Sequence, residues 1–243
     1  MLDAVLFDWG DTLMRFDWDD ERVAVGQAAG LEAAGIEPFA DAEAVSRRFI
    51  DHINAHYGSG VPEELEYPGL IRAILGEFGI ALDDEQLAAF LEAEHAAWDS
   101  ARHLASTSHA LLDSLRADGL RIGLVSNTFD PPWLLYRDLE QLGLAERVEA
   151  VVFSSELGYR KPHPQIFEAA LERLGVEAQR ALFVGDRLYE DVLGAARAGM
   201  RTVQALWFRA DEHPEGGEPD FQAFTQMDVL NIARRLQTAV SPS

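Results

Sequence analysis

The stretch "AVLFDWGDTLM", residues 4–14, starts as a short apolar run and then places two carboxylates around a Trp-Gly pair. Short runs of Val, Leu and Phe are typical of buried parallel strands. Here the run ends at Phe7, and Asp8 and Asp11 follow it. The stretch therefore predicts a buried strand that delivers acidic side chains to one edge of a sheet.

Four further apolar runs follow later in the chain: "RIGLVS" (121–126), "EAVVFS" (149–154), "ALFV" (181–184) and "RTVQALW" (201–207). Amphipathic stretches lie before and between them, near residues 107–118, 133–143, 164–174 and 189–198. Gly119, Gly143, Gly175 and Gly199 stand where these helices are expected to end. This alternation predicts an α/β fold with a doubly wound parallel sheet.

Residues 15–102 break the alternation, because they are mostly helical in period and contain no convincing strand. This insert leaves after the first strand and returns before the second, so we expect it above the ligand-binding edge of the sheet. We predict a core of residues 1–14 and 103–243 and a helical cap of residues 15–102. The stretch "RADEHPEGGEPDF" (209–221) predicts a surface loop before a last helix near 226–238.

The composition limits the possible partners. The 243 residues carry a formal net charge of -22, which disfavours nucleic acid and anionic membrane surfaces, and they include no Cys. No apolar run is long enough to span a membrane, and no signal-peptide pattern is present. We therefore expect a cytoplasmic protein, monomeric or homodimeric, with a small-molecule ligand.

Four of the predicted strands are followed by polar groups. The first is followed by Asp8, the second ends in Ser126 and Asn127, and the fourth is followed by Asp186. Lys161, the single lysine beside 19 arginines, follows the third strand within "SSELGYRKPHPQIF" (154–167). Because the carboxyl ends of parallel strands share one edge, we expect these groups to lie together.

This set of residues favours phosphoryl chemistry. Asp8, Asp186 and Asp191 would repel one another unless a cation neutralised them, and oxygen ligands of this kind suit Mg²⁺. A carboxylate can also attack phosphorus to give an aspartyl-phosphate. The Lys161 ammonium and the Ser126 hydroxyl could then hold the phosphoryl oxygens.

The motifs "FDWGDTL", "LVSNT", "GYRKPHPQIF" and "VGDRLYEDVLGA" resemble, in order, those of the haloacid dehalogenase-like (HAD) hydrolase superfamily, in the subgroup with a helical cap after the first motif. The resemblance covers residues 4 to 208 and implies a Rossmann-like core and a Mg²⁺-dependent phosphatase of small phosphorylated metabolites. It also implies the roles of individual residues. Asp8 would be the nucleophile; Lys161, Ser126, Asn127 and Thr12 would bind phosphate; Asp8, Asp186, Asp191 and the backbone carbonyl of Gly10 would bind the metal.

One position departs from the pattern. Phosphatases of this family usually read Asp-x-Asp-Gly-Thr, and their second Asp is the acid and base of the reaction; here that position is Gly10, and Asp11 comes one place later. Residues three apart in an extended strand lie on opposite faces, so the Asp11 carboxylate is expected to point away from Asp8. We predict a slow phosphatase with a long-lived aspartyl-phosphate, or one that takes its proton donor from the cap or the substrate.

Three alternatives follow from Gly10. A 2-haloacid dehalogenase would leave the acids of "GDRLYED" (185–191) unexplained, and a phosphonate hydrolase of this family would need a cap lysine, which residues 15–102 do not contain. A non-catalytic protein that binds phosphate and Mg²⁺ would have no need of Asp8.

The cap carries no motif that identifies the substrate. Candidates to line the site are Trp18, His52, His56, Tyr57 and Trp98, whereas Arg160 and Arg187 are expected to be surface charges and His163 to be structural.

Overall fold

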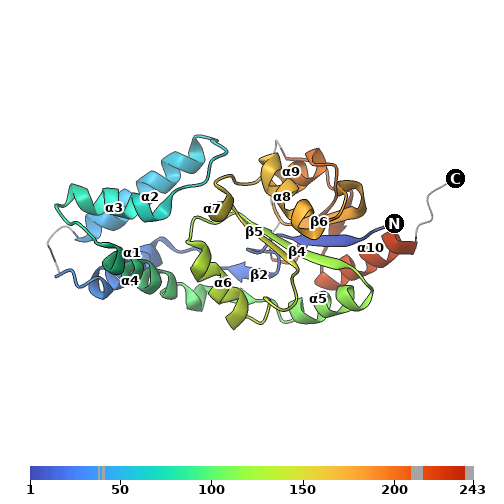
Figure 1. The fold of residues 1–243 in the computed structure, drawn as a ribbon, viewed down its shortest axis with the longest axis horizontal. Helices are drawn as coiled ribbons and strands as arrows, with labels where there is room; N and C mark the ends of the chain where they lie inside the picture. The colour runs from blue at the N-terminus through green and yellow to red at the C-terminus, as the bar shows by residue number, and fades with distance from the viewer. Residues whose placement is uncertain (38, 40–41, 209–215, 239–243) are drawn as a thin grey trace.

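The fold is taken from a computed structural model that describes residues 1–37, 39, 42–208 and 216–238. Its centre is a parallel sheet, which in the described residues has the order β5-β4-β1-β6-β7-β8 (Figure 1). The strands are β1 (Ala4–Phe7), β4 (Arg121–Ser126), β5 (Ala150–Phe153), β6 (Ala181–Gly185), β7 (Arg201–Ala205) and β8 (Phe221–Ala223). This confirms the predicted α/β fold with a parallel sheet.

Helices cover both faces of the sheet, which explains why the strands are apolar throughout. Val5 and Phe7 of β1 pack into the core beside α5 (Ser108–Ala117), α6 (Pro132–Gln141) and α10 (Gln226–Thr238). Ala4 and Leu6 face the opposite core, beside α8 (Pro164–Leu174) and α9 (Gly194–Arg197). Because successive side chains of a strand point to opposite faces, the four residues of β1 contribute to the apolar cores on both sides of the sheet.

The strand order reverses direction beside β1. The chain runs from β1 to β4 and β5 on one side, and then crosses to β6 and β7 on the other. In open α/β sheets such a reversal opens a crevice at the carboxyl ends of the flanking strands, here β1, β4 and β6. The residues at these ends are Asp8, Ser126 and Asp186.

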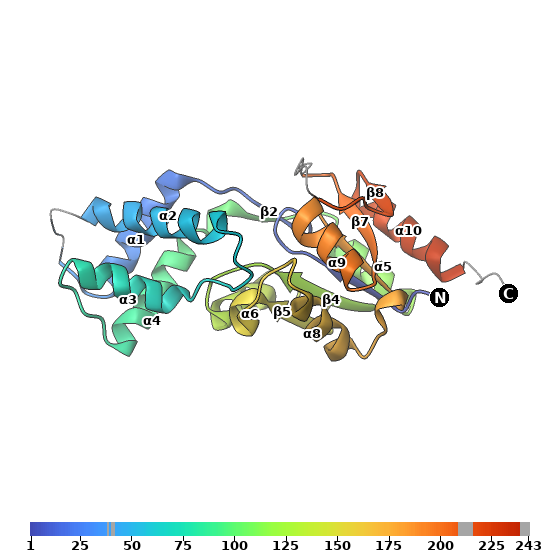
Figure 2. The same cartoon turned by 90° about the horizontal axis from the view of Figure 1, so that it is seen from above.

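The insert after β1 is a separate helical layer at one end of the molecule (Figures 1 and 2). It contains α1 (Asp20–Ala33), α2 (Ala42–Gly58), α3 (Tyr67–Glu77) and α4 (Asp84–Ala96). These helices bury their own apolar cluster, which includes Val23, Phe49, Ile71 and Phe90. A capping box between Asp83 and Gln86 begins α4. None of the described helices has the length and apolar character of a membrane span.

The connection between insert and core is a two-stranded antiparallel ribbon of β2 (Met14–Phe16) and β3 (Arg102–Leu104). No strand was expected in the insert, so this ribbon corrects that expectation at both ends of residues 15–102. Each strand has only three residues, too few for a periodic pattern to be recognised.

The other predicted elements match the structure closely. The predicted bounds agree with the structure for the strands at 4–7 and 121–126 and for the last helix at 226–238. The strands expected at 149–154 and 201–207 are shorter in the structure. Gly119, Gly143, Gly175 and Gly199 all have positive φ, between 62° and 88°.

Some elements were missed. Strand β8 was not predicted, and the helix expected near 189–198 is divided into a π-helical turn, Leu188–Leu193, and α9. Residues 209–215 of the predicted tail loop lie outside the described residues. The remaining short elements are α7 (Ser154–Leu157) and 3₁₀ turns at Asp99–Ala101 and Ala178–Arg180.

A buried ionic cluster ties the insert to the core. His95 of α4 lies with Nε2 2.9 Å from Asp138 of α6 and Nδ1 3.3 Å from Asp130. Arg102 of β3 lies 3.3 Å from Asp138. Burial alone would lower the pKa of His95, but hydrogen bonds to Asp130 and Asp138 outweigh it and raise this pKa to about 9, against opposition from Arg102.

This cluster predicts a stability that depends on pH. A histidine whose pKa is raised in the folded state stabilises the fold fully below its unfolded pKa of 6.5, and that contribution disappears as the pH rises to about 9. We expect the unfolding free energy to fall by up to about 3 kcal/mol over this window. Urea denaturation at a series of pH values measures it.

The His95→Gln variant should lack this slope between pH 6.5 and 9. His52→Gln, at an exposed position, is the matched control and should keep it. A wild-type slope in His95→Gln would show that other groups produce the pH dependence.

Candidate active site

Asp8 is the first residue after β1, and neighbouring strands fix its position. Its backbone N–H donates to the carbonyl of Val184 in β6 at 2.8 Å. The residue is 7% exposed, and Thr12 Oγ1 donates to its Oδ2 at 3.3 Å. The predicted nucleophile and the predicted hydroxyl therefore lie in contact.

Lys161 brings the loop after β5 to Asp8. Its Nζ donates to Asp8 Oδ1 and to Asp191 Oδ1, both at 2.6 Å, and the residue is 2% exposed. Burial would lower the pKa of Lys161, but the charges of Asp191 and Asp8 outweigh it and hold this pKa above its usual range. The ammonium group therefore stays protonated at neutral pH.

Asn127 fixes the backbone of Lys161. Its Oδ1 accepts from the Lys161 N–H at 2.7 Å, and its Nδ2 donates to the Lys161 carbonyl at 3.1 Å. This reciprocal pair joins the end of β4 to the lysine loop. Asn127 was predicted to bind phosphate, and in the structure its side-chain amide positions the lysine.

The three predicted acids form one cluster. Asp8, Asp186 and Asp191 are at most 7% exposed, and one carboxylate oxygen from each lies within 4.8 Å of the others. The second oxygen of Asp191 accepts from the backbone N–H of Arg187 at 2.9 Å. Gly185 makes room for this arrangement, because a Cβ there would lie 2.3 Å from the Asp191 carboxyl carbon.

The cluster fits a divalent cation. Three carboxylates face one ammonium group, so the group keeps a formal negative charge that a buried site requires to be balanced. Carboxylate oxygens at this spacing are the ligands that Mg²⁺ prefers. Asp8, Asp186 and Asp191 are the residues that would hold the ion.

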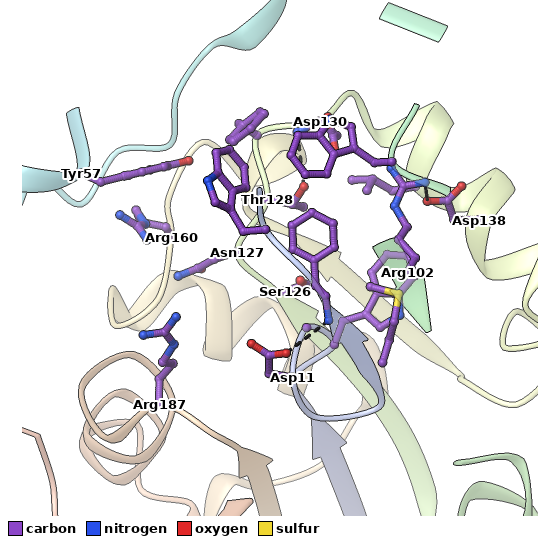
Figure 3. Close-up of a pocket in the computed structure, with 18 of the residues that line it drawn as sticks. Asp11, Tyr57, Arg102, Ser126, Asn127, Thr128, Asp130, Asp138, Arg160 and Arg187 are labelled. Carbon is purple, nitrogen blue, oxygen red and sulfur yellow. Dashed lines mark hydrogen bonds and ion pairs between the residues drawn. The ribbon is translucent and has the colours of Figure 1, made fainter. Parts of the chain in front are cut away.

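A cavity of about 430 Å³ adjoins this cluster. The core contributes Gly10, Asp11, Ser126 and Asn127 to its lining (Figure 3). Asp8 and Lys161 do not line it, but their sequence neighbours Trp9 and Arg160 do. The cavity therefore ends beside the carboxylates and the lysine.

Three of the five candidate residues of the insert line the cavity: Trp18, Tyr57 and Trp98. His52 is exposed and His56 is half-buried, and they contact the backbone carbonyls of Arg48 and Glu63 instead.

The structure corrects the expectation for two arginines. Arg160 and Arg187 were expected to be surface charges, and both line the cavity (Figure 3). Each is adjacent in sequence to a residue of the buried cluster, Lys161 or Asp186, which places it at the edge of the site.

Other lining residues were not foreseen: Glu94, Arg102, Asp130 and Asp138. Burial, followed by the charge of Asp130, raises the pKa of Glu94 to about 7. No sequence motif marks these residues, because they meet only when α4 packs beside α6.

The position of Asp11 differs from the reasoning based on strand geometry. β1 ends at Phe7, and Asp11 has a positive φ of 55°, so the alternation of an extended strand does not reach it. Its Oδ1 accepts from the Phe16 N–H at 3.2 Å, and the residue lines the cavity together with Gly10 (Figure 3). A Cβ at Gly10 would meet no atom within 4 Å, so the backbone there leaves room for a β-carbon.

A parallel α/β core, whose strand ends hold buried acids and one lysine beside a helical insert, defines a doubly wound α/β protein with a ligand site at the carboxyl edge of its sheet. The chain belongs to the haloacid dehalogenase-like hydrolase family, whose model matches residues 2–199.

The comparisons include proteins similar to nearly the whole chain. A glyceraldehyde 3-phosphate phosphatase of Methanopyrus kandleri is 30% identical over 239 residues, which cover 97% of this chain and 99% of that protein. A HAD phosphatase of Thermococcus onnurineus shares the fold with a TM-score of 0.64 at 24% identity, covering 95% of this chain and 97% of that one. A 2-haloacid dehalogenase of Pseudomonas syringae pv. Tomato shares it with a TM-score of 0.65 at 24% identity, covering 97% and 100%.

The two short contacts of Lys161 predict a large effect of its removal. We expect Lys161→Met to lower the unfolding free energy by about 3 kcal/mol in buffer with EDTA, because Asp8 and Asp191 lose the cation between them. Adding Asp191→Asn should recover part of this loss. Urea denaturation of the single and double variants measures both effects.

Arg116→Met, at an exposed position, is the control and should change stability by less than about 0.5 kcal/mol. Additive losses in the double variant would contradict the coupling.

Proposed function

We propose that this protein is a Mg²⁺-dependent phosphatase that hydrolyses a small phosphorylated metabolite through an aspartyl-phosphate on Asp8. The observation that carries the proposal is the pair of 2.6 Å contacts from Lys161 Nζ to Asp8 and Asp191, in a cluster with Asp186. The Methanopyrus kandleri relative is named for glyceraldehyde 3-phosphate, so phosphate esters of three-carbon compounds come first in the set of substrates to be assayed.

In the first step an Asp8 carboxylate oxygen attacks phosphorus, the bond from phosphorus to the leaving oxygen breaks, and its electron pair stays on that oxygen. The Lys161 ammonium and the Ser126 hydroxyl donate hydrogen bonds to the phosphoryl oxygens. Mg²⁺ held by Asp8, Asp186, Asp191 and the Gly10 carbonyl would supply neutralisation of the phosphoryl charge. Water then attacks phosphorus, which releases phosphate and regenerates the Asp8 carboxylate.

The site lacks a side chain at position 10 that could act as the acid and base of the reaction. The leaving oxygen needs a proton, and the attacking water must lose one, but Gly10 offers no side chain where the family pattern has an Asp. Asp11 lines the cavity, yet its carboxylate accepts from Phe16 N–H. A missing acid and base costs a factor of about 10² to 10⁴ in rate. We therefore propose that the aspartyl-phosphate is long-lived.

Two other functions are less well supported. A 2-haloacid dehalogenase has a use for Asp8 but not for the buried acids Asp186 and Asp191, and the similarity to solved dehalogenases concerns the fold alone. A non-catalytic protein that binds phosphate and a cation is favoured by Gly10. The close contact of Lys161 with a buried Asp8 argues against it, since binding alone needs no nucleophile.

Rapid-quench experiments test the proposal directly. With an aryl phosphate and Mg²⁺ we expect phosphorylated Asp8 to accumulate faster than phosphate is released, and we expect EDTA to abolish it. Asp8→Asn should form none. Calorimetry should show Mg²⁺ binding that Asp186→Asn weakens. Rapid turnover without accumulation would contradict the slow second step, and binding of phosphate without any covalent product would favour the non-catalytic function.

Gly10 offers a test of the missing acid and base. Because a Cβ at this position meets no atom within 4 Å, Gly10→Asp should fold and should raise the dephosphorylation rate by about 10²-fold or more. Gly10→Asn is the matched control, since it has the same shape without the acid. Equal rates in the two variants would show that another group already transfers the proton.

A further inference from the structure

We propose that Arg160 and Arg187 form a second anion-binding subsite, so that the substrate carries a carboxylate or a further phosphate beside the phosphoryl group that is cleaved. This inference rests on the proposed phosphatase function, and it names the class of substrate. The subsite lies in the wall of the cavity, next to the cluster of Asp8, Lys161 and Asp191.

Arg160 is positioned for a ligand that the described residues do not supply. Its guanidinium carbon lies 4.1 Å from the centre of the Tyr57 ring, and its Nε is buried without a hydrogen-bond partner among them. Its backbone N–H donates to the Pro62 carbonyl at 2.9 Å, which holds this part of the chain against the insert. A guanidinium group that stacks on a ring keeps its edge free to donate to an oxyanion.

Arg187 is the second cation of the subsite. Its Nε lies 3.5 Å from Asp186 Oδ2, longer than a strong charged hydrogen bond, and its side chain is 41% exposed. Figure 3 shows Arg160, Asn127 and Arg187 along the same side of the cavity, and all three line it.

The charges around the cavity support this assignment. The chain has a net charge of -22, so two guanidinium groups in one cavity wall stand out from their surroundings. Acidic side chains also lie on this side: Asp186 is 3.5 Å from Arg187, and Glu64 accepts from the Tyr57 hydroxyl at 2.9 Å and from Ser154 at 2.6 Å. Asp138 lies on the opposite side of the cavity in Figure 3, and both Asp138 and Asp130 pair with His95.

The phosphoryl group does not need these arginines. Lys161 already supplies a cation at 2.6 Å from Asp8, and Ser126 supplies a hydroxyl. Arg160 precedes Lys161 in the sequence, and Arg187 follows Asp186. Each arginine is therefore the sequence neighbour of a residue of the buried cluster. Because Arg160, Arg187 and Ser126 line the same cavity, a substrate can present a second anionic group to the arginines while its phosphoryl group lies at Ser126.

Two pairs of substrates test the subsite. 3-Phosphoglycerate and glyceraldehyde 3-phosphate have the same carbon skeleton and differ in a carboxylate against an aldehyde. Fructose 1,6-bisphosphate and fructose 6-phosphate differ in a second phosphate. We expect at least one anionic member to have a kcat/KM about 10-fold or more above its partner, because the partner lacks the anionic group that accepts a charged hydrogen bond from an arginine. The pair that shows the preference identifies the anionic group.

Variants assign that preference to the arginines. Arg160→Gln and Arg187→Gln should each lower kcat/KM for the preferred anionic substrate by about 10- to 100-fold, chiefly through KM, and bring the ratio within the pair towards one. Arg160→Lys and Arg187→Lys should retain part of it. Arg116→Gln, at an exposed position outside the lining, should leave the ratio unchanged. A purely structural role of Arg160 against Tyr57 would lower both members of a pair equally.

The outcomes separate this inference from the proposed function. Hydrolysis with ratios near one in both pairs, or with ratios that the arginine variants do not change, overturns the subsite and leaves the phosphatase in place. If no phosphate ester is hydrolysed and no phosphorylated Asp8 forms, the phosphatase fails. Calorimetry with 3-phosphoglycerate and fructose 1,6-bisphosphate then decides: the subsite stands if either binds and Arg160→Gln weakens that binding about 10-fold, and it falls otherwise.

Discussion

The buried ammonium group of Lys161 is the contact on which the site depends. Asp8 and Asp191 follow different strands, and both approach Nζ to 2.6 Å. Without a cation between them, these carboxylates would repel one another in a place that excludes water. A lysine suits this position because its charge is compact, whereas the planar guanidinium of an arginine needs more room. In a chain of 19 arginines and one lysine, the lysine is the cation at this buried position.

The parallel strands could be predicted because the information for them is local. A strand that is buried on both faces must be apolar at nearly every position. Ala4–Phe7 is apolar throughout, and Arg121–Ser126 is apolar between its two end residues. The three-residue strands could not. Met14 pairs with Leu104, and Phe221 pairs with Val203, so these strands exist through partners that are distant in the sequence. Their sequences alone carry no period.

The site was predictable to the same extent. Topology places Asp8, Ser126 and Asp186 at one edge of the sheet, so their proximity follows once the strands are known. The direction of side chains at the edge of the site does not follow, because the insert decides it. Arg160 faces the cavity beside Tyr57, which comes about a hundred positions earlier. Asp11 lies beyond the end of β1 and has a positive φ, so the alternation of strand side chains does not apply to it.

One loop of the insert contacts both Tyr57, which lines the cavity, and the segment that leads to Lys161. Glu64, in the connection between α2 and α3, accepts from Tyr57 at 2.9 Å and from Ser154 at 2.6 Å, and its backbone N–H donates to Gly158 at 3.0 Å. Ser154 and Gly158 belong to the segment that leads from β5 to Lys161. The insert therefore holds the lysine loop in place through the same residues that position Tyr57 over the cavity. Movement of this loop would displace Tyr57, Arg160 and the lysine backbone together, so the loop couples this wall of the cavity to the position of Lys161.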